Sequence, residues 1–352
     1  MTRPFNIPLP RAAAFAALVV LTLAVVATRQ AGASPVAATP SEDSAPAWSP
    51  NGSTLVFASR ASGHWQIYSV NANGGGRRAL TSGTLDSVDV AWSPSGKQIA
   101  FSKVAGGQEV TTGHVYVMNA GGGGLRRVTS SAGADDELFN WSPDGSTLAF
   151  DRITNGLGAI YTVKANGSGL KKLTPSANDD DYWAAWSPDG SKIAFDRTGS
   201  SAFGDIWVMN ADGSGQKRLT SSSADEFGSA WSPDGKKIAF QSNRSRRYQI
   251  YVMSANGGAE HRVTHSATDA EEPRWSPDGK KLVFQEQVGA NFQIFVSNAD
   301  GSGAHQLTNV AYDNTDPSWS PDGKKIAFLS QRNGGASVFV MNADGSGQKK
   351  IA

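Results

Sequence analysis

The chain has 352 residues, enough for one large domain or two ordinary ones, and its 32 Lys and Arg nearly balance 31 Asp and Glu. This balance leaves no excess of positive charge for a nucleic-acid backbone, and the absence of cysteine excludes disulfides, a thiolate nucleophile and cysteine-ligated metals. With 39 glycines and a hydrophobic fraction of 39%, the composition is typical of many short strands joined by tight turns.

The N-terminus has the three parts of a secretory signal peptide. Arg3 and Arg11 precede an apolar run from Ala12 to Ala27, and the small residues of "AGA" (31–33) follow it. We therefore expect residues 1–33 to be a signal peptide, or alternatively an uncleaved anchor, although a membrane span needs about 20 apolar residues. Residues 34–44 are expected to be a flexible lead-in. Everything after them is expected outside the cytoplasm, in the periplasm, in the cell envelope or secreted.

Seven copies of one motif fill residues 45–352, starting near residues 45, 87, 136, 181, 226, 270 and 314. Each copy contains Trp-Ser-Pro, and a phenylalanine always follows the tryptophan by nine residues. The tryptophans are Trp48, Trp92, Trp141, Trp186, Trp231, Trp275 and Trp319, and the phenylalanines are Phe57, Phe101, Phe150, Phe195, Phe240, Phe284 and Phe328. An interval without insertions across seven copies indicates a segment of fixed geometry.

Each copy reads as four short strands. The first ends at the tryptophan, "SPDG" makes a tight turn, and "KIAF" is the second strand. The alternating "IYVMN" is the third, "ADGSG" or "ANGG" makes the next hairpin, and a short basic stretch such as "QKRLT" is the fourth. Four antiparallel strands every 44 to 49 residues are typical of a β-propeller, whose blades bury their faces against one another. We predict an all-β propeller of seven four-stranded blades, with six blades as the alternative, closed by packing without strand exchange.

The motif "WSPDGKKIAF…IYVMNADGSG…RLT" resembles the WD40-like PD40 repeat of TolB-type propellers, from about residue 45 to residue 352. The resemblance implies an extracytoplasmic propeller that serves as a protein-binding platform. TolB itself is a periplasmic component of a cell-envelope complex, with an α/β domain before six blades. This chain departs on both points, so the resemblance concerns the propeller and not membership in the Tol–Pal system. The propeller also resembles the cap of prolyl oligopeptidases, but the chain has no G-x-S-x-G nucleophile turn.

Acidic residues gather just before each tryptophan, and two interpretations are open. They could encircle one mouth of the channel and attract a cation or a basic peptide. Alternatively, they could pair with the base that follows the second-strand phenylalanine in six copies, namely Arg60, Lys103, Arg152, Arg197, Arg244 and Arg332. The sixth copy lacks that base, so Glu271, Glu272 and Glu286 would form the most acidic sector if they converge.

A second candidate for ligand binding lies in "DDDYWAAWSP", where Asp180 and Asp181 stand beside Tyr182 and Trp183. Aromatic side chains on propeller loops are frequent binding anchors, and they are equally frequent in blade packing. Function should lie where the copies disagree, which is here, in the longer loop of residues 101–115 and in the sixth blade.

No catalytic, cofactor or metal residue is predicted. The five histidines are scattered, and "NADGSG" lacks the distal Glu of an EF-hand. We therefore predict a monomeric, non-catalytic platform for a protein or peptide, touching a membrane only through an uncleaved N-terminus. The alternatives are a propeller enzyme of polysaccharide lyase or hydrolase type, a propeller whose peptidase domain is on a partner, and an anchored structural subunit. Paired carboxylates beside a His or Arg would favour glycoside chemistry, whereas acids each paired with an Arg would disfavour it.

Overall fold

The computed structural model describes residues 42–44, 46–105, 112–174, 178–199 and 203–352. The predicted signal peptide and most of the lead-in lie outside these residues, as do residues 106–111 of the longer loop. The described part of the chain has no helix that is long and apolar enough to cross a membrane.

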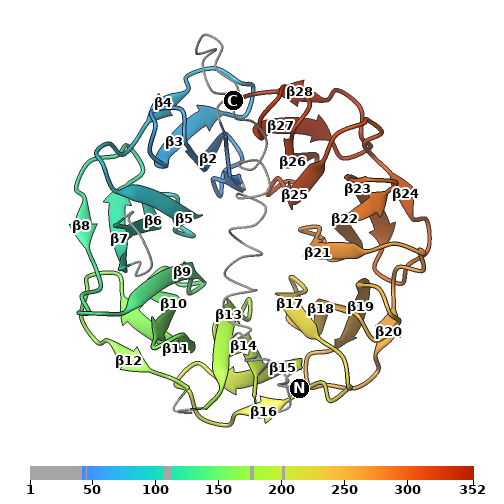
Figure 1. The fold of residues 1–352 in the computed structure, drawn as a ribbon, viewed down its shortest axis with the longest axis horizontal. Helices are drawn as coiled ribbons and strands as arrows, with labels where there is room; N and C mark the ends of the chain where they lie inside the picture. The colour runs from blue at the N-terminus through green and yellow to red at the C-terminus, as the bar shows by residue number, and fades with distance from the viewer. Residues whose placement is uncertain (1–41, 45, 106–111, 175–177, 200–202) are drawn as a thin grey trace, which may run out of the picture.

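The strands of the described residues form seven four-stranded antiparallel sheets arranged as the blades of a ring (Figure 1). The innermost strands are β1 (Ala47–Trp48), β5 (Asp86–Trp92), β9 (Asp135–Trp141), β13 (Asp180–Trp186), β17 (Glu226–Trp231), β21 (Ala270–Trp275) and β25 (Asn314–Trp319). The second strands are β2 (Thr54–Ser59), β6 (Gln98–Val104), β10 (Thr147–Thr154), β14 (Lys192–Thr198), β18 (Lys237–Ser242), β22 (Lys281–Val288) and β26 (Lys325–Ser330). The third strands are β3 (Gln66–Asn71), β7 (Gly113–Asn119), β11 (Leu157–Lys164), β15 (Gly204–Asn210), β19 (Gln249–Ser254), β23 (Asn291–Asn298) and β27 (Ser337–Asn342). The outermost strands are β4 (Arg78–Ala79), β8 (Arg126–Arg127), β12 (Lys171–Lys172), β16 (Lys217–Arg218), β20 (His261–Arg262), β24 (His305–Gln306) and β28 (Lys349–Lys350).

The prediction of seven four-stranded blades is confirmed, and the six-bladed alternative is wrong. Each sheet takes four consecutive strands, so among the described residues no strand is exchanged between blades.

The repeated "SPDG" is the turn between the first two strands, as blade 5 shows. Asp234 accepts the Ser232 hydroxyl at 2.6 Å, and the Ser232 hydroxyl oxygen accepts the Lys237 amide at 2.9 Å. Gly235 takes a φ of 68°, a conformation that favours glycine, and a Cβ there would stand 3.6 Å from Pro188 of blade 4. The decapeptide is therefore repeated because one turn contacts the same turn of the neighbouring blade.

The repeated phenylalanines form the core between blades. Phe240 is fully buried, stacks on Tyr251 at 5.8 Å and packs on Ala194 and Ile206 of blade 4. The tryptophans have a different role, since Trp231 donates its indole N–H to the Ala185 carbonyl of blade 4 at 3.0 Å. Phenylalanine burial thus joins each blade to the one before it, and in five of the seven blades a tryptophan hydrogen bond adds to this contact.

The seam between blades 7 and 1 repeats these contacts. Trp48 donates to the Ser318 carbonyl at 3.2 Å, and Lys349 donates to the Asn73 carbonyl at 2.8 Å. Packing therefore closes the ring as predicted, with hydrogen bonds that the prediction omitted. The end of the expected lead-in belongs to this seam, because the Asp43 amide donates to the Ala336 carbonyl at 2.9 Å and the Asp43 side chain is buried. Asp43 thus contributes to the closure of the ring.

Candidate functional site

The inner strands all run in the same direction through the ring, so their first residues share one rim and the "SPDG" turns share the other. Near the first rim, bulges interrupt the pairing of six inner strands with the second strands. In five of these strands the bulge contains a residue of positive φ, namely Asp89 (53°), Trp183 (53°), Gly228 (72°), Glu272 (57°) or Asp316 (52°). Because a bulge redirects a side chain, this position differs between blades while the turns at the other rim are uniform.

One group of the acids before the tryptophans forms hydrogen bonds with the preceding blade. Asp180 accepts the Gly158 amide of blade 3 at 2.7 Å, and Asp269 accepts the Tyr248 amide of blade 5 at 2.9 Å. Asp86, Asp225 and Asp313 make the same contact with the preceding blade at 2.9, 3.3 and 2.8 Å. Each of these carboxylates accepts a backbone amide at or next to the start of a third strand, so each has a structural role.

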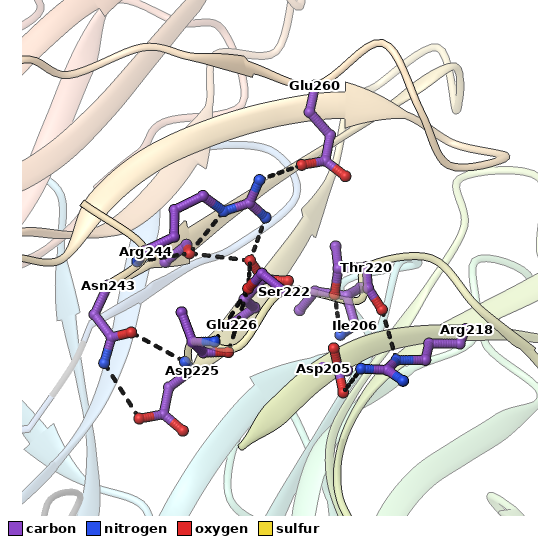
Figure 2. A network of polar contacts seen from close by, with 12 residues as sticks. Asp205, Ile206, Arg218, Thr220, Ser222, Asp225, Glu226, Asn243, Arg244 and Glu260 are labelled. Carbon is purple, nitrogen blue, oxygen red and sulfur yellow. Dashed lines mark hydrogen bonds and ion pairs between the residues drawn. The ribbon is translucent and has the colours of Figure 1, made fainter. Parts of the chain in front are cut away.

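A second group forms ion pairs in blades 3, 4 and 5, in agreement with the second of the two interpretations that the sequence left open. Arg152 pairs with Asp136 at 2.6 Å, Arg197 with Asp181 at 2.5 Å, and Arg244 with Glu226. Figure 2 shows Arg244 between Glu226 and Glu260, with Ser222 on the same Glu226 carboxylate. Asp181, a predicted ligand-binding residue, is thus a buried partner of Arg197.

Three blades depart from this pairing. In blade 1 the base is Arg77, 3.5 Å from Asp43, and Arg60 instead donates to the Gly63 carbonyl. In blade 7 Arg332 meets the neutral Asn314 at 3.2 Å. In blade 2 Ser87 stands where the acid should be and is paired across the strands with Lys103.

A third group of carboxyls has no base in an ion pair among the described residues, and it begins on blades 2 and 3. Glu137 lies directly opposite Asp151 in the β9–β10 pairing, so both side chains share the face toward blade 4. Desolvation and the charges of Asp89 and Asp135 raise the pKa of Glu137 to about 8. Desolvation raises the pKa of Asp89 to about 6 and that of the buried Asp151 well above its usual value.

The other part of this group lies on blades 4 to 7. Desolvation and Glu272 raise the pKa of Glu271 to about 7 and that of Asp316 to about 6. Desolvation, with a smaller contribution from the charge of Glu272, raises the pKa of the fully buried Asp196 of blade 4. Blade 5 lies between these two residues, and its bulge residue, Gly228, has no side chain. We call Asp89, Glu137, Asp180, Glu271, Glu272 and Asp316 the acidic rim; of these, Asp180 also belongs to the first group and Glu272 pairs with Arg274.

The predicted sector of Glu271, Glu272 and Glu286 is divided between two faces. Glu271 opposes Gln285 and receives its amide at 3.5 Å, while Glu286 opposes Ala270. Adjacent residues of a strand point to opposite faces, so Glu286 faces blade 5 and Glu271 faces blade 7. Glu272 forms an ion pair with Arg274 at 2.7 Å. Glu271 and Glu272 therefore come together with Asp316, and Glu286 instead bonds with Ser266.

Tyr182 and Trp183 belong to an aromatic cluster that the other blades do not repeat. The ring centre of Trp183 lies 5.9 Å from that of Tyr182 and 5.6 Å from that of Phe227. The ring centres of Phe227 and Tyr248 are 5.2 Å apart. We call these four residues the aromatic cluster. Phe227 and Tyr248 were not predicted, although Phe227 stands where most copies have a small or polar residue.

The acidic rim shows no metal-ligand group among the described residues, and two grooves lie elsewhere. Among the described residues no group of three or more His, Asp or Glu could hold a metal ion. Grooves of about 610 and 380 Å³ lie at the opposite rim, between the turns of blades 4 and 5 and those of blades 7 and 1. They are lined by the repeated Ser-Pro-Asp residues, so they arise from the repeat itself.

The fold and the rim define a seven-bladed propeller with a group of carboxyls at one end of its channel. Residues 18–181, 182–313 and 268–352 match the family model of the TolB beta propeller domain (PD40), so the chain belongs to this family, as the repeat predicted.

Solved structures of several functions are similar to this chain. The TolB of Agrobacterium tumefaciens is 26% identical, with a TM-score of 0.53, over 65% of this chain and 84% of that one. An oligogalacturonate lyase from Vibrio parahaemolyticus is 15% identical, with a TM-score of 0.70, over 88% and 92%. A puromycin-hydrolyzing peptidase from Mycobacterium tuberculosis is 14% identical, with a TM-score of 0.70, over 91% and 55%. The last two likenesses show the fold alone, so the choice between binding and catalysis depends on the residues of this chain.

Proposed function

We propose that this protein is a non-catalytic, extracytoplasmic platform that binds a basic segment of a partner protein over the acidic rim. The observation that carries the proposal is the division of the acids into three groups. Two groups are satisfied by backbone amides or by arginines, and the third lies at one rim without a basic partner in an ion pair among the described residues, except for Glu272, which pairs with Arg274. A channel opening lined by charge of one sign concentrates ligands of the opposite sign.

The positions of the variable loops favour the same rim as the binding surface. Connections between the second and third strands, and between one blade and the next, lie at this end of the ring, whereas the repeated "SPDG" and "NADGSG" turns lie at the other. Segments that differ between copies can recognise a specific partner, whereas identical turns maintain the scaffold. The N-terminal signal that the sequence predicts supports the extracytoplasmic location.

The enzyme alternative has one observation in its favour, since buried carboxyls with raised pKa values are frequent at active sites. A polyuronate substrate, however, is itself an anion, and the acidic rim would repel it. A lyase of that type would bring cations to its substrate, so we favour binding over catalysis.

The test is the affinity for two labelled peptides of opposite charge, measured by fluorescence anisotropy at low and at high salt. We expect the basic peptide to bind, the acidic one not to bind, and salt to weaken binding because exposed charges are screened within about 10 Å at 0.1 M. A variant with Glu271→Gln, Glu272→Gln and Asp316→Asn should lose most of the affinity.

A matched control removes the same number of charges from the opposite rim, through Asp212→Asn, Asp300→Asn and Asp344→Asn. Each of these residues is exposed in a "NADGSG" hairpin and accepts a serine amide at 2.9 Å, a bond that Asn can keep. If the control variant loses as much affinity as the rim variant, general charge explains binding and the proposal is wrong.

A further inference from the structure

The bulge residue of blade 4, Trp183, is aromatic, unlike the bulge residues of the other blades at this rim. Asp89, Glu272 and Asp316 occupy this position in three other blades, and Gly228 occupies it in blade 5. Trp183 is partly exposed here, with Tyr182 on one side and the buried Phe227 on the other.

Carboxylates surround this aromatic cluster. Asp225 lies near Tyr248, since the Asn243 amide donates both to the Asp225 carboxylate at 3.2 Å and to the Tyr248 hydroxyl at 3.4 Å. Desolvation, with the charge of Asp225 next, raises the pKa of Tyr248 to about 12. The charge of Asp180 contributes to the raised pKa of Tyr182, and the charge of Glu271 contributes to the raised pKa of Tyr248, after desolvation in both cases. An aromatic surface enclosed by carboxylates is complementary to an organic cation.

A buried carboxyl supplies an independent observation. Asp196 is opposite Tyr182 in the β13–β14 pairing, so it shares the face of Tyr182. One of its oxygens accepts the Gly228 amide at 2.8 Å, and the other, Oδ1, is buried without a hydrogen-bond partner among the described residues. A buried carboxyl oxygen ordinarily accepts a hydrogen bond, so Oδ1 of Asp196 could accept one beside Tyr182.

The protein already uses one recognition motif five times. Arg77, Arg152, Arg197, Arg244 and Arg332 each place a guanidinium over a pair of aromatic rings, 4.5 to 4.9 Å from the nearer ring centre. In blades 3, 4 and 5 the same guanidinium binds a buried carboxylate. Stacking on a ring combined with forked hydrogen bonds to a carboxylate suits arginine and not lysine.

We propose that the aromatic cluster, together with Asp225, Asp180 and Glu271, forms a subsite for an arginine side chain of the partner, whose guanidinium stacks on Trp183 and donates to the carboxylates. This inference rests on the proposed function, because the arginine belongs to the basic segment held at the rim. The absence of a metal-ligand group among the described residues and the presence of aromatic faces favour an organic cation over a metal ion.

The test compares three labelled heptapeptides in which glycine alternates with arginine, with lysine or with citrulline. Citrulline has nearly the shape of arginine without its charge, so it separates charge from shape. We expect the arginine peptide to bind the wild-type protein about tenfold more tightly than the lysine peptide, because guanidinium stacking adds to charge attraction. The citrulline peptide should bind weakly or not at all.

Variants locate the preference within the molecule. Trp183→Leu should abolish the preference for arginine over lysine, and Trp183→Phe should keep most of it. Tyr312→Leu is the matched control, since Tyr312 is an exposed aromatic residue before the inner strand of blade 7. It should change neither affinity.

The outcomes separate this inference from the proposed function. Equal binding of the arginine and lysine peptides to the wild-type protein, with no binding of citrulline, overturns the arginine subsite and leaves the platform standing. An arginine preference that survives Trp183→Leu also overturns the subsite. If citrulline binds as well as arginine, or if none of the three peptides binds, both proposals are wrong.

Discussion

Replacing Glu137 by glutamine tests whether the carboxyls of blades 2 and 3 repel one another. The folded protein raises the pKa of Glu137 to about 8, mainly by desolvation and the charge of Asp89, against 4.5 for an unperturbed glutamate. Between these two values the folded state keeps a proton that the unfolded state releases. The contribution of Glu137 to the free energy of unfolding should therefore be most favourable at and below about pH 4.5 and fall as the pH rises toward 8.

The pKa difference sets the size of the effect. Each pKa unit corresponds to about 1.4 kcal/mol, so a rise to about 8 limits the loss to about 5 kcal/mol. Glu137 is partly accessible from the channel and shares the repulsion with its neighbours, so we expect about 1–3 kcal/mol. Glutamine keeps the shape and removes the charge, which should remove this part of the pH dependence.

The assay is urea denaturation of the wild-type protein and of Glu137→Gln at pH 5, 7 and 9. The variant should gain stability over the wild type as the pH rises, and the two should differ least at pH 5. Asp344→Asn serves as the control, since Asp344 is exposed at the other rim and should leave the wild-type trend unchanged. Parallel pH profiles for Glu137→Gln and the wild type would refute the reasoning.

Three further predictions follow from the same contacts. Arg197→Met should destabilise the protein by about 3–5 kcal/mol, because it leaves the buried Asp181 without its partner, and Arg197→Met combined with Asp181→Asn should recover part of the loss in urea denaturation. Gly228→Ala should cost about 1 kcal/mol of stability because of its φ of 72°, and a variant as stable as the wild type would contradict this account of the bulge. Binding of the basic peptide should weaken as the pH falls through 7, since Glu271, whose pKa is about 7, then becomes neutral, and Glu271→Gln should flatten that dependence in an anisotropy titration.

The scaffold was predictable because a closed ring repeats its contacts. The constant interval from Trp231 to Phe240 covers a strand end, a turn and a strand, and the structure has these elements in every blade. The ion pair of Arg197 with Asp181 was predictable for the same reason, since acid and base recur in register. Repetition thus reveals geometry wherever the same contact occurs in each copy.

The rim was harder to predict, because it depends on which face each acid occupies. Glu271 and Glu286 are close in the sequence pattern, yet their strand pairing places them on opposite faces of blade 6. Asp151 and Asp196 directly follow the repeated phenylalanines and therefore point toward the next blade, a consequence of strand alternation that could have been drawn from the sequence. The bulge at Trp183 has no comparable signal, since neither proline nor glycine marks it.

The central claim is that the acidic rim, and not the repeated turns, receives the partner. The most direct measurement is cross-linking of a photoreactive arginine-containing peptide to the protein, with the attachment sites located by mass spectrometry. We predict cross-links near the starts of the inner strands of blades 4 to 6, at residues 178–183, 225–228 and 269–272. Cross-links concentrated on the "SPDG" and "NADGSG" turns of the opposite rim would contradict the claim.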